Sequence, residues 1–425
     1  MKYQELKEYL LSSDFDQILR NVICCDDIGK EKERYLTLLE EAFHSYGDGD
    51  YHFISSPGRS EIGGNHTDHQ HGHVLAAALN IDNLAVVKAN DDQIVRYYDK
   101  AFTPIEVDLK DLSIHEEEKN TSYALIRGIA AKLEEEGYKT GGFYAICDSH
   151  VLIGSGISSS ACFEVMVAEI FSALYNDDSV TPVQRAIYGQ YAENVYFGKP
   201  SGLMDQTAIS VGGFVAIDFK DSAHPVIENH DFSFSDYGYE LILVNTKGDH
   251  ADLSDEYAAI TREIKDVAHE LGVEYLADSD LETLLKNLPS IREKLKNDRG
   301  LLRSIHFYNE DERAVKQKEA VKEKDIDRLL SLMKESARSS YEYLQNINVS
   351  SRPWSQSLGL ALALVDTVLQ GEGACRVHGG GFEGTIQIVC PKDKVRKLKE
   401  TMNSVFGDDS VMELKVRPSG TKLII

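Results

Sequence analysis

The sequence has no long apolar run and no excess of basic charge. No window approaches the roughly 18 uninterrupted apolar residues that a membrane-spanning helix needs. Segment 1–17 is charged and amphipathic and has no apolar signal-peptide core, so we expect a cytoplasmic location. The formal net charge of −25 argues against the basic surfaces that bind nucleic acid or anionic membrane.

Paired cysteine motifs and internal repeats are also missing. The spacing of the six cysteines excludes a zinc ribbon and predicts free thiols in a reducing compartment. Hydrophobic residues make up 42% of the chain and charged residues 27%, as in ordinary globular proteins. A length of 425 residues suits about two domains.

Strand-like and helix-like patterns alternate in the first half of the chain. A helical stripe runs through 123–133 and closes at Gly137. After about residue 250 the pattern is mostly amphipathic helix, which predicts α+β character in both halves and a split near 220–240. Short runs rich in β-branched or aromatic residues predict strands at 83–89, 142–149, 212–219, 239–246 and 385–390.

A loop of small residues, GSGISSSA at 154–161, lies between a predicted strand and a predicted helix. The first N–H groups of a helix are unpaired and attract anions, and glycines let a phosphate approach the backbone. The loop is not a Walker A motif, because no GKS or GKT follows. It is either a phosphate cradle or a glycine-rich turn with a serine N-cap.

A second glycine cluster, GGG at 379–381, precedes the predicted strand 385–390. Glycine loses more conformational entropy on folding than other residues. Three in succession therefore favour a place where backbone packs closely on backbone or ligand, although a flexible hairpin remains an alternative.

Segment 63–74, GGNHTDHQHGHV, holds four histidines and an aspartate within eight positions. On a strand, alternate histidines would share one face, so a zinc site is conceivable. The order of these residues matches no ligand spacing that we can justify. A carbohydrate site also needs carboxylates, amides and histidines, because hydroxyls both donate and accept hydrogen bonds.

Six motifs in order resemble the galactokinase branch of the GHMP small-molecule kinases. The first two are SSPGRSEIGGNHTDHQHG (55–72), similar to the PGRVNLIGEHTDYNGG signature, and LIGSGISSSACFEV (152–165), similar to the ATP-phosphate motif. The others are ENVYFGKPSGLMDQ (193–206), VNTKGDHADLSDEYAAITREI (244–264), LMKESARSSYEYL (332–344) and GACRVHGGGFEGTIQIV (373–389).

This resemblance implies a fold and an activity. The fold would be the α+β two-domain GHMP kinase fold, with a ribosomal-protein-S5-like domain over 1–220, a ferredoxin-like α+β domain over 221–425, and the active site between them. The implied activity is transfer of the γ-phosphate of ATP to the C1 hydroxyl of D-galactose, with Mg²⁺. The partners would be a sugar and ATP, with no nucleic acid or membrane, and the protein a monomer or weak homo-oligomer.

The resemblance also implies roles for individual residues. Arg59 and Asp205 would be catalytic and would also contact the sugar. The other implied sugar-binding residues are Asn65, His66, Asp68, Gly202 and Tyr257. The implied ATP-binding residues are Gly154, Ser155, Gly156, Ile157, Ser158, Ser159 and Ser160, and the magnesium ligands would be Ser160 and Glu193.

The chain departs from the family pattern at several positions. Asn65 stands where the signature has glutamate, and Glu61 stands where it has asparagine. His69-Gln70 replaces Tyr-Asn, Leu152 replaces proline, and Glu383 interrupts the last glycine run. If Asn65 faces C6 of the sugar, the loss of a carboxylate removes a repulsion of about 4 kcal/mol toward galacturonate.

Galacturonate or another galactose derivative is therefore an alternative substrate, although we can place no cation for it. Two other classes remain open, a non-catalytic galactose sensor and a zinc hydrolase. The intact SSSA sequence (158–161), together with Arg59 and Asp205, favours the kinase over the sensor.

Overall fold

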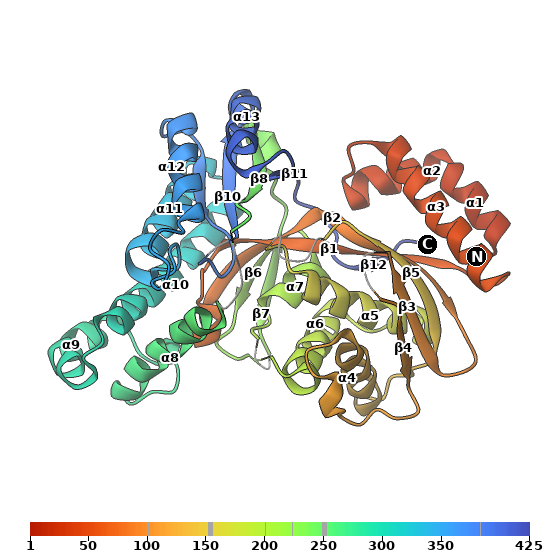
Figure 1. The fold of residues 1–425 in the computed structure, drawn as a ribbon, viewed down its shortest axis with the longest axis horizontal. Coiled ribbons are helices and arrows are strands. Elements are labelled where there is room, and N and C mark those ends of the chain that lie inside the picture. The colour runs from red at the N-terminus through yellow and green to blue at the C-terminus, as the bar shows by residue number, and fades with distance from the viewer. Residues whose placement is uncertain (101–102, 152–155, 200, 223, 249–252, 383) are drawn as a thin grey trace.

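The structure is a computed structural model of the chain. It describes residues 1–100, 103–151, 156–199, 201–222, 224–248, 253–382 and 384–425. Two β-sheets are each covered by helices and lie on either side of a shared core (Figure 1). Within the described ranges, no helix has the length and apolar character to cross a bilayer.

The first sheet has eight strands. Its central path runs β12-β1-β2-β5-β3-β4, with β6 paired to the far end of β2 and β7 paired to β6. All pairs are antiparallel except β3 with β5. The strands are β1 (His52–Gly63), β2 (His73–Ala89), β3 (Ile94–Asp99), β4 (Ile105–Asp108), β5 (Phe143–Ser149), β6 (Phe214–Asp218), β7 (Val226–His230) and β12 (Lys422–Leu423).

Helices cover both faces of this sheet, so its central strands are buried on both sides (Figure 1). Phe53 of β1 packs against the N-terminal helices, and the next residue, Ile54, packs against α4 and α5 on the opposite face. The N-terminal layer is α1 (Tyr3–Leu11), α2 (Ser13–Ile18), the π-helical turn η1 (Leu19–Ile23) and α3 (Ile28–Tyr46). The other layer is α4 (Ser122–Glu135), α5 (Ser159–Tyr175), α6 (Pro182–Tyr191), the π-helical turn η4 (Ala192–Phe197) and α7 (Met204–Val211).

The second sheet is antiparallel, in the order β11-β8-β10-β9. One face packs against α12 and α13, and the other contributes to the core shared with the first sheet. Its strands are β8 (Tyr239–Asn245), β9 (Ala374–Val377), β10 (Thr385–Pro391) and β11 (Val411–Leu414). The helices of this half are α8 (Ser254–Glu270), α9 (Leu281–Leu295), α10 (Asp298–Glu323), α11 (Ile326–Ser339), the π-helical turn η7 (Ser340–Leu344), α12 (Ser357–Leu369) and α13 (Val395–Phe406).

Short 3-10 turns complete the described secondary structure. They are η2 (Asp68–Gln70), η3 (Glu116–Glu118), η5 (Phe234–Tyr237), η6 (Leu276–Asp278) and η8 (Lys392–Lys394). The first of them carries Asp68, one of the predicted sugar-binding residues, into the loop between β1 and β2.

The two-domain α+β prediction is confirmed, but the boundary at 220/221 does not describe the sheets. β7 follows residue 220 and still belongs to the first sheet. The C-terminal tail also returns there, where Leu423 pairs with Ile54. The tail passes so close to the end of α7 that a Cβ on Gly212 would lie 2.1 Å from the Gly420 nitrogen. The first domain therefore includes residues from both ends of the chain.

A buried ionic cluster fastens this tail to the first sheet. Asp82 of β2 accepts a 2.8 Å hydrogen bond from Arg34 of α3 and lies 3.5 Å from Arg417, which is fully buried. Arg417 also donates to Ser55 of β1 at 2.6 Å. Burial would raise the pKa of Asp82, but the charges of Arg34 and Arg417 outweigh burial and lower it.

We expect Asp82→Ala to destabilise the protein by about 3–5 kcal/mol, because it leaves the fully buried Arg417 without its carboxylate partner and removes one of the carboxylates paired with Arg34. Denaturant unfolding followed by circular dichroism measures this change. Asp50→Ala is the matched control, since Asp50 pairs with Lys2 at 3.5 Å on the exposed surface. It should cost less than about 1 kcal/mol. Equal effects of the two substitutions would contradict this account of the cluster.

Candidate active site

Arg59 and Asp205, 146 positions apart, form a two-point ion pair. Arg59 Nε donates to Asp205 Oδ1 at 2.7 Å, and Nη2 donates to Oδ2 at 2.8 Å. Arg59 lies on β1, and Asp205 lies in the first turn of α7, where the helix dipole favours a carboxylate. About 30% of the Asp205 side chain is exposed, against 8% for Arg59, so the carboxylate is the accessible member of the pair.

The small-residue turn before α5 adjoins this pair. Arg59 Nη1 donates to the Gly156 carbonyl at 2.5 Å, and the Arg59 backbone N–H donates to the Ile157 carbonyl at 3.2 Å. Ser158 is the N-cap residue of α5, yet its hydroxyl does not cap the helix and donates to Asp205 Oδ2 instead. The N-terminal N–H groups of α5 therefore have no side-chain cap.

These contacts determine the charge of Asp205. Burial would raise its pKa, but the charge of Arg59 and the hydrogen bonds from Arg59 and Ser158 lower it below the usual value. The carboxylate is therefore ionised at neutral pH. Its Oδ1 accepts from Arg59 alone among the described residues, so a lone pair remains for a ligand hydroxyl.

The structure describes only residues 156–161 of the predicted phosphate loop. Ile157 is fully buried, whereas Gly156 and Ser160 are exposed and Ser159 is half-buried. Gly154 and Ser155 lie outside the described residues, as do Leu152 and Glu383.

The loop after β1 brings His66 and Asp68 to the same region. His66 Nε2 donates to the Gly380 carbonyl at 3.0 Å, which leaves Nδ1 as the acceptor of a neutral ring. Burial lowers the pKa of His66 to about 3, so the ring is neutral at pH 7. A Cβ on Gly202 would lie 2.1 Å from Asp68 Oδ2, so only glycine allows this approach.

Tyr257 of α8 borders the same glycine cluster. Its hydroxyl donates to the Gly381 carbonyl at 2.9 Å. A Cβ on Gly380 would lie 2.5 Å from a ring carbon of Tyr257. Of the two explanations for this cluster, close packing therefore applies, because backbone and side chains pack directly on the glycines.

Asn65 differs from the expectation of direct sugar contact. Its side chain is fully buried and its amide group is occupied by protein partners. The amide nitrogen donates to Glu61 Oε1 at 3.0 Å and to the Gly379 carbonyl at 2.9 Å, and its oxygen accepts from Ser340 and Asn346 at 3.1 and 2.9 Å. Asn65 thus ties the loop after β1 to η7 and to the glycine cluster.

Glu61 and Arg376 form a second buried ion pair, which motif comparison did not predict. Arg376 Nη2 donates to Glu61 Oε1 at 2.7 Å, and both side chains are almost fully buried. Burial raises the pKa of Glu61 despite the opposing charges of Arg376 and Arg59. The sequence did contain a signal for this pair. An acid stands at position 61, where the family signature has asparagine, and the motif 373–389 contains an arginine that could pair with it.

The histidines of 63–74 have separate partners. His71 stacks on Tyr275 at 3.7 Å between ring centroids, and His73 lies between Asp311 at 2.9 Å and Asp218 at 3.5 Å. The ring of His69 lies 5.9 Å from that of His66. Over the described ranges, no group of three or more His, Cys, Asp or Glu side chains could hold a metal ion. This removes the main support for a zinc site.

Glu193, the predicted magnesium ligand, lies in η4 and is buried. Lys199 contacts its Oε1 at 2.8 Å, and Ser201 and Gln206 donate to Oε2 at 2.5 and 3.1 Å. Ser160 lies in the first turn of α5. Hydroxyl and carboxylate oxygens are the donors that Mg²⁺ prefers, so the chemistry of these two side chains fits the ion, while in this structure Lys199 is the counter-ion of Glu193.

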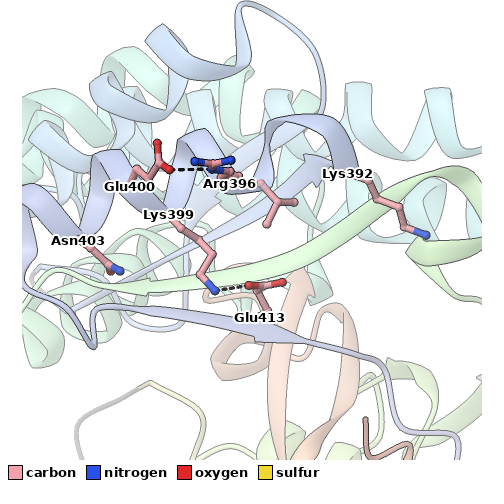
Figure 2. A pocket seen from close by; sticks show the side chains of 7 residues that line it. Lys392, Arg396, Lys399, Glu400, Asn403 and Glu413 are labelled. Atoms are coloured by element: carbon pink, nitrogen blue, oxygen red, sulfur yellow. Dashed lines mark hydrogen bonds and ion pairs between the residues drawn. The ribbon is translucent and has the colours of Figure 1, made fainter. Parts of the chain in front are cut away.

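A hollow beside the second sheet (Figure 2) is lined by none of the site residues named above. Lys392, Arg396 and Lys399 line it, together with Val395, Glu400, Asn403 and Glu413. Arg396 pairs with Glu400 at 2.9 Å, and Lys399 pairs with Glu413. Because these cations already have acidic partners, the hollow offers no convergent charge for an anion.

Comparisons with known proteins agree with this geometry. The family model for the galactokinase galactose-binding signature matches residues 40–89, and the model for the N-terminal domain of GHMP kinases matches 124–213. Both matched segments are thus similar to GHMP kinases, and the curated relatives that match over most of the chain are galactokinases.

Two of these relatives are galactokinases from Clostridium tetani and Pyrococcus furiosus. That of Clostridium tetani is 26% identical over 382 residues, covering 87% of this chain and 93% of the relative. That of Pyrococcus furiosus is 27% identical over 356 residues, covering 82% and 92%.

Solved structures show the same fold. Lactococcus lactis galactokinase, solved with galactose, has a TM-score of 0.78 at 21% identity and covers 92% of this chain and 99% of that one. Methanococcus jannaschii mevalonate kinase has a TM-score of 0.62 at 15% identity and covers 87% and 99%. The prediction of a GHMP kinase fold is thus confirmed.

His73 gives a pH-dependent prediction. The hydrogen bond to Asp311 raises the pKa of His73, with further help from Asp218 and against burial and Lys318. Protonated His73 therefore stabilises the folded protein fully at pH values below its unfolded pKa of about 6.5. This stabilisation is lost as the pH rises through the higher pKa that His73 has in the folded protein. We expect His73→Gln to lower the thermal midpoint more at about pH 5.5 than at about pH 8.5.

Asp311→Asn is the companion variant for this measurement. It removes the carboxylate that contributes most to the raised pKa of His73 and leaves Asp218, so adding His73→Gln to it should have an effect that depends less on pH. Equal losses at both pH values in the wild-type background would contradict the assignment.

Proposed function

We propose that this protein transfers the γ-phosphoryl group of ATP to the C1 hydroxyl of D-galactose, giving galactose 1-phosphate. The observation that carries the proposal is the Arg59–Asp205 ion pair beside the Gly156 turn. It combines an accessible carboxylate, a guanidinium and an uncapped helix N-terminus. Phosphoryl transfer needs a positioned nucleophile and stabilised charge rather than covalent chemistry from the protein.

Asp205 orients the nucleophile and accepts its proton. An aspartate with a lowered pKa is a weak base toward an alcohol, so the proton leaves late, as the sugar oxygen begins to bond phosphorus. The available lone pair on Oδ1 gives the C1 hydroxyl a partner. Arg59 keeps the carboxylate ionised and offsets charge on the transferring group.

The sugar contacts come from His66, Asp68, Gly202 and Tyr257. The neutral His66 ring offers an acceptor at Nδ1, and Asp68 offers carboxylate oxygens to the ring hydroxyls. Gly202 gives Asp68 the space it needs, and Tyr257 supports the Gly380–Gly381 backbone from the second domain. Asn65 acts as a positioning residue that holds this loop.

The nucleotide phosphates would bind at the N-terminus of α5. The turn Gly156–Ser160 presents backbone N–H groups and hydroxyls there, and Gly154 and Ser155 complete it by resemblance. Ser160 and Glu193 would hold Mg²⁺. When bound, the ion neutralises charge on the β and γ phosphates.

A net charge of −25 and a small-molecule site support work in the cytoplasm on a sugar and ATP, without nucleic acid. We propose a monomer or weak homo-oligomer.

The alternatives are less well supported. The case for galacturonate required Asn65 to face the sugar, yet that side chain is fully buried, and a carboxylate, Glu61, lies 3.0 Å from its nitrogen. The Arg376 guanidinium near it is already paired with Glu61. A non-catalytic sensor would have no need for the assembled Arg59–Asp205 pair.

We expect Arg59→Gln to reduce turnover by at least about 100-fold, because it removes charge stabilisation at the transferring group. It should also raise the pKa of Asp205, since burial is no longer offset. The acid limb of the pH–rate profile, where activity is lost as Asp205 is protonated, should therefore move to higher pH.

Arg396→Gln is the control, because Arg396 is exposed on α13 and its ionic partner among the described residues is Glu400, also at the surface. Asp205→Ala should abolish turnover while the circular dichroism spectrum is retained. Near-normal activity in either active-site variant would contradict the assigned roles.

A hexose panel tests the substrate. With ATP and Mg²⁺, sugar-dependent ADP release should be faster with galactose than with glucose or galacturonate by at least about 10-fold, because a misplaced hydroxyl leaves a buried partner unpaired. A preference for galacturonate would overturn the choice of sugar. No sugar-dependent ADP release would overturn the kinase proposal in favour of the sensor.

A further inference from the structure

His378 is a buried side chain to which the mechanism above assigns no task. It follows β9 and precedes the glycine cluster, and only 3% of it is exposed. Its backbone N–H donates to the Thr385 carbonyl at 3.0 Å, which fixes the residue between β9 and β10. The ring contacts Ser60 and the Glu61 backbone of β1, so it joins the second sheet to the strand that carries Arg59.

Hydrogen bonds at one ring nitrogen determine the tautomer of His378. The Glu61 backbone N–H, which can only donate, points at Nε2 from 3.3 Å. Ser60 Oγ lies 3.0 Å from the same atom and itself accepts from the Gln387 amide nitrogen at 2.5 Å, so its proton is directed to the ring. Nε2 is therefore an acceptor, and a neutral ring must carry its proton on Nδ1.

The ring is neutral because of its surroundings. Burial lowers the pKa of His378 well below its usual value, and the charges of Arg59 and Arg376 lower it further, against the opposing charge of Asp205. Both guanidinium groups belong to ion pairs already described. A second proton on this imidazole would therefore be strongly disfavoured at neutral pH.

The remaining N–H has no acceptor in the described part of the chain. Nδ1 lies 3.2 Å from the position that a Cβ on Gly156 would occupy. The Gly156 carbonyl is in turn the acceptor of Arg59 Nη1. The unpaired donor therefore borders the turn that meets the Arg59–Asp205 pair. Buried donors are nearly always paired, so this one calls for an acceptor beyond the described residues, such as a bound ligand.

The surroundings define the chemistry of that acceptor. The N-terminus of α5 and the Arg59 guanidinium favour an anionic oxygen. A neutral N–H can bind this oxygen without placing a further positive charge near Asp205. We propose that His378 donates its Nδ1–H to an oxygen of the terminal phosphoryl group of the nucleotide. This inference rests on the proposed kinase function and adds a phosphate-binding residue to it.

Two substitutions separate the two ring nitrogens. The amide of glutamine in His378→Gln reaches the position of Nε2 and can accept from Glu61, but it leaves no donor at Nδ1. The shorter amide in His378→Asn restores a donor near Nδ1 and gives up the contact with Glu61. His378→Gln thus tests the contact between Nδ1 and the phosphate. His378→Asn shows how much nucleotide affinity is lost when only the contact between Nε2 and Glu61 is removed.

Calorimetric titration without sugar measures the effect. ADP lacks the terminal phosphoryl group that a β,γ-imido analogue of ATP carries. We expect His378→Gln to bind the analogue about 10-fold more weakly than wild type, with unchanged affinity for ADP, since a hydrogen bond to a charged group is lost. His378→Asn should bind the analogue within about threefold of wild type.

The outcomes separate this inference from the proposal beneath it. If the wild-type protein binds neither nucleotide, the kinase proposal and this inference fall together. If it binds both, and His378→Gln weakens them equally or not at all, only this inference falls.

A second measurement uses the wild-type protein, so it does not depend on a variant that folds. In protein labelled with ¹⁵N at histidine, the Nδ1–H signal of a buried ring should shift when the analogue is added and stay in place with ADP. A signal that responds equally to both nucleotides would overturn the proposal.

Discussion

The two-point ion pair between Arg59 and Asp205 is the contact on which the site depends. It joins the middle of β1 to the first turn of α7, and the same guanidinium also holds the Gly156 carbonyl. One side chain thus sets the distance between a carboxylate and the N-terminus of α5. Two parallel hydrogen bonds fix the orientation of the two side chains as well as their distance. The Arg59–Asp205 geometry is therefore preorganised before a ligand binds.

A second layer of buried polar contacts holds this frame against the other half of the molecule. Glu61, Asn65 and Arg376 connect the end of β1 to β9 and to the glycine cluster. Glu310 of α10 accepts from the backbone N–H groups of Gly64 and Asn65 at 3.2 and 3.4 Å. These groups are costly to bury unless each finds its partner, so they specify one relative position of the two sheets.

Part of this arrangement could be read from the sequence. The spacing of apolar residues predicted the helix through 123–133, found as α4, and the motif matches identified both members of the central ion pair. The sequence could not predict where the Asn65 side chain points, because a motif does not distinguish an amide buried among protein partners from one that faces a ligand. β1 was also missed, since a strand covered on both faces lacks alternation and this one carries Pro57 and Gly58 in its interior. The return of the C-terminal tail to the first sheet was not predicted, because pairing between distant segments leaves no local signal.

The returning C-terminal tail has a consequence for how the protein is made. Ser55 and Arg417, hydrogen-bonded at 2.6 Å, are 362 positions apart, and synthesis proceeds at about 5–20 residues per second. The first sheet therefore waits roughly 20–70 s on the ribosome for its last strand. Throughout that interval the edge of β1 that later receives β12 is unpaired. Nascent chains are thus exposed to wrong strand pairing until the segment that carries β12 has been synthesised.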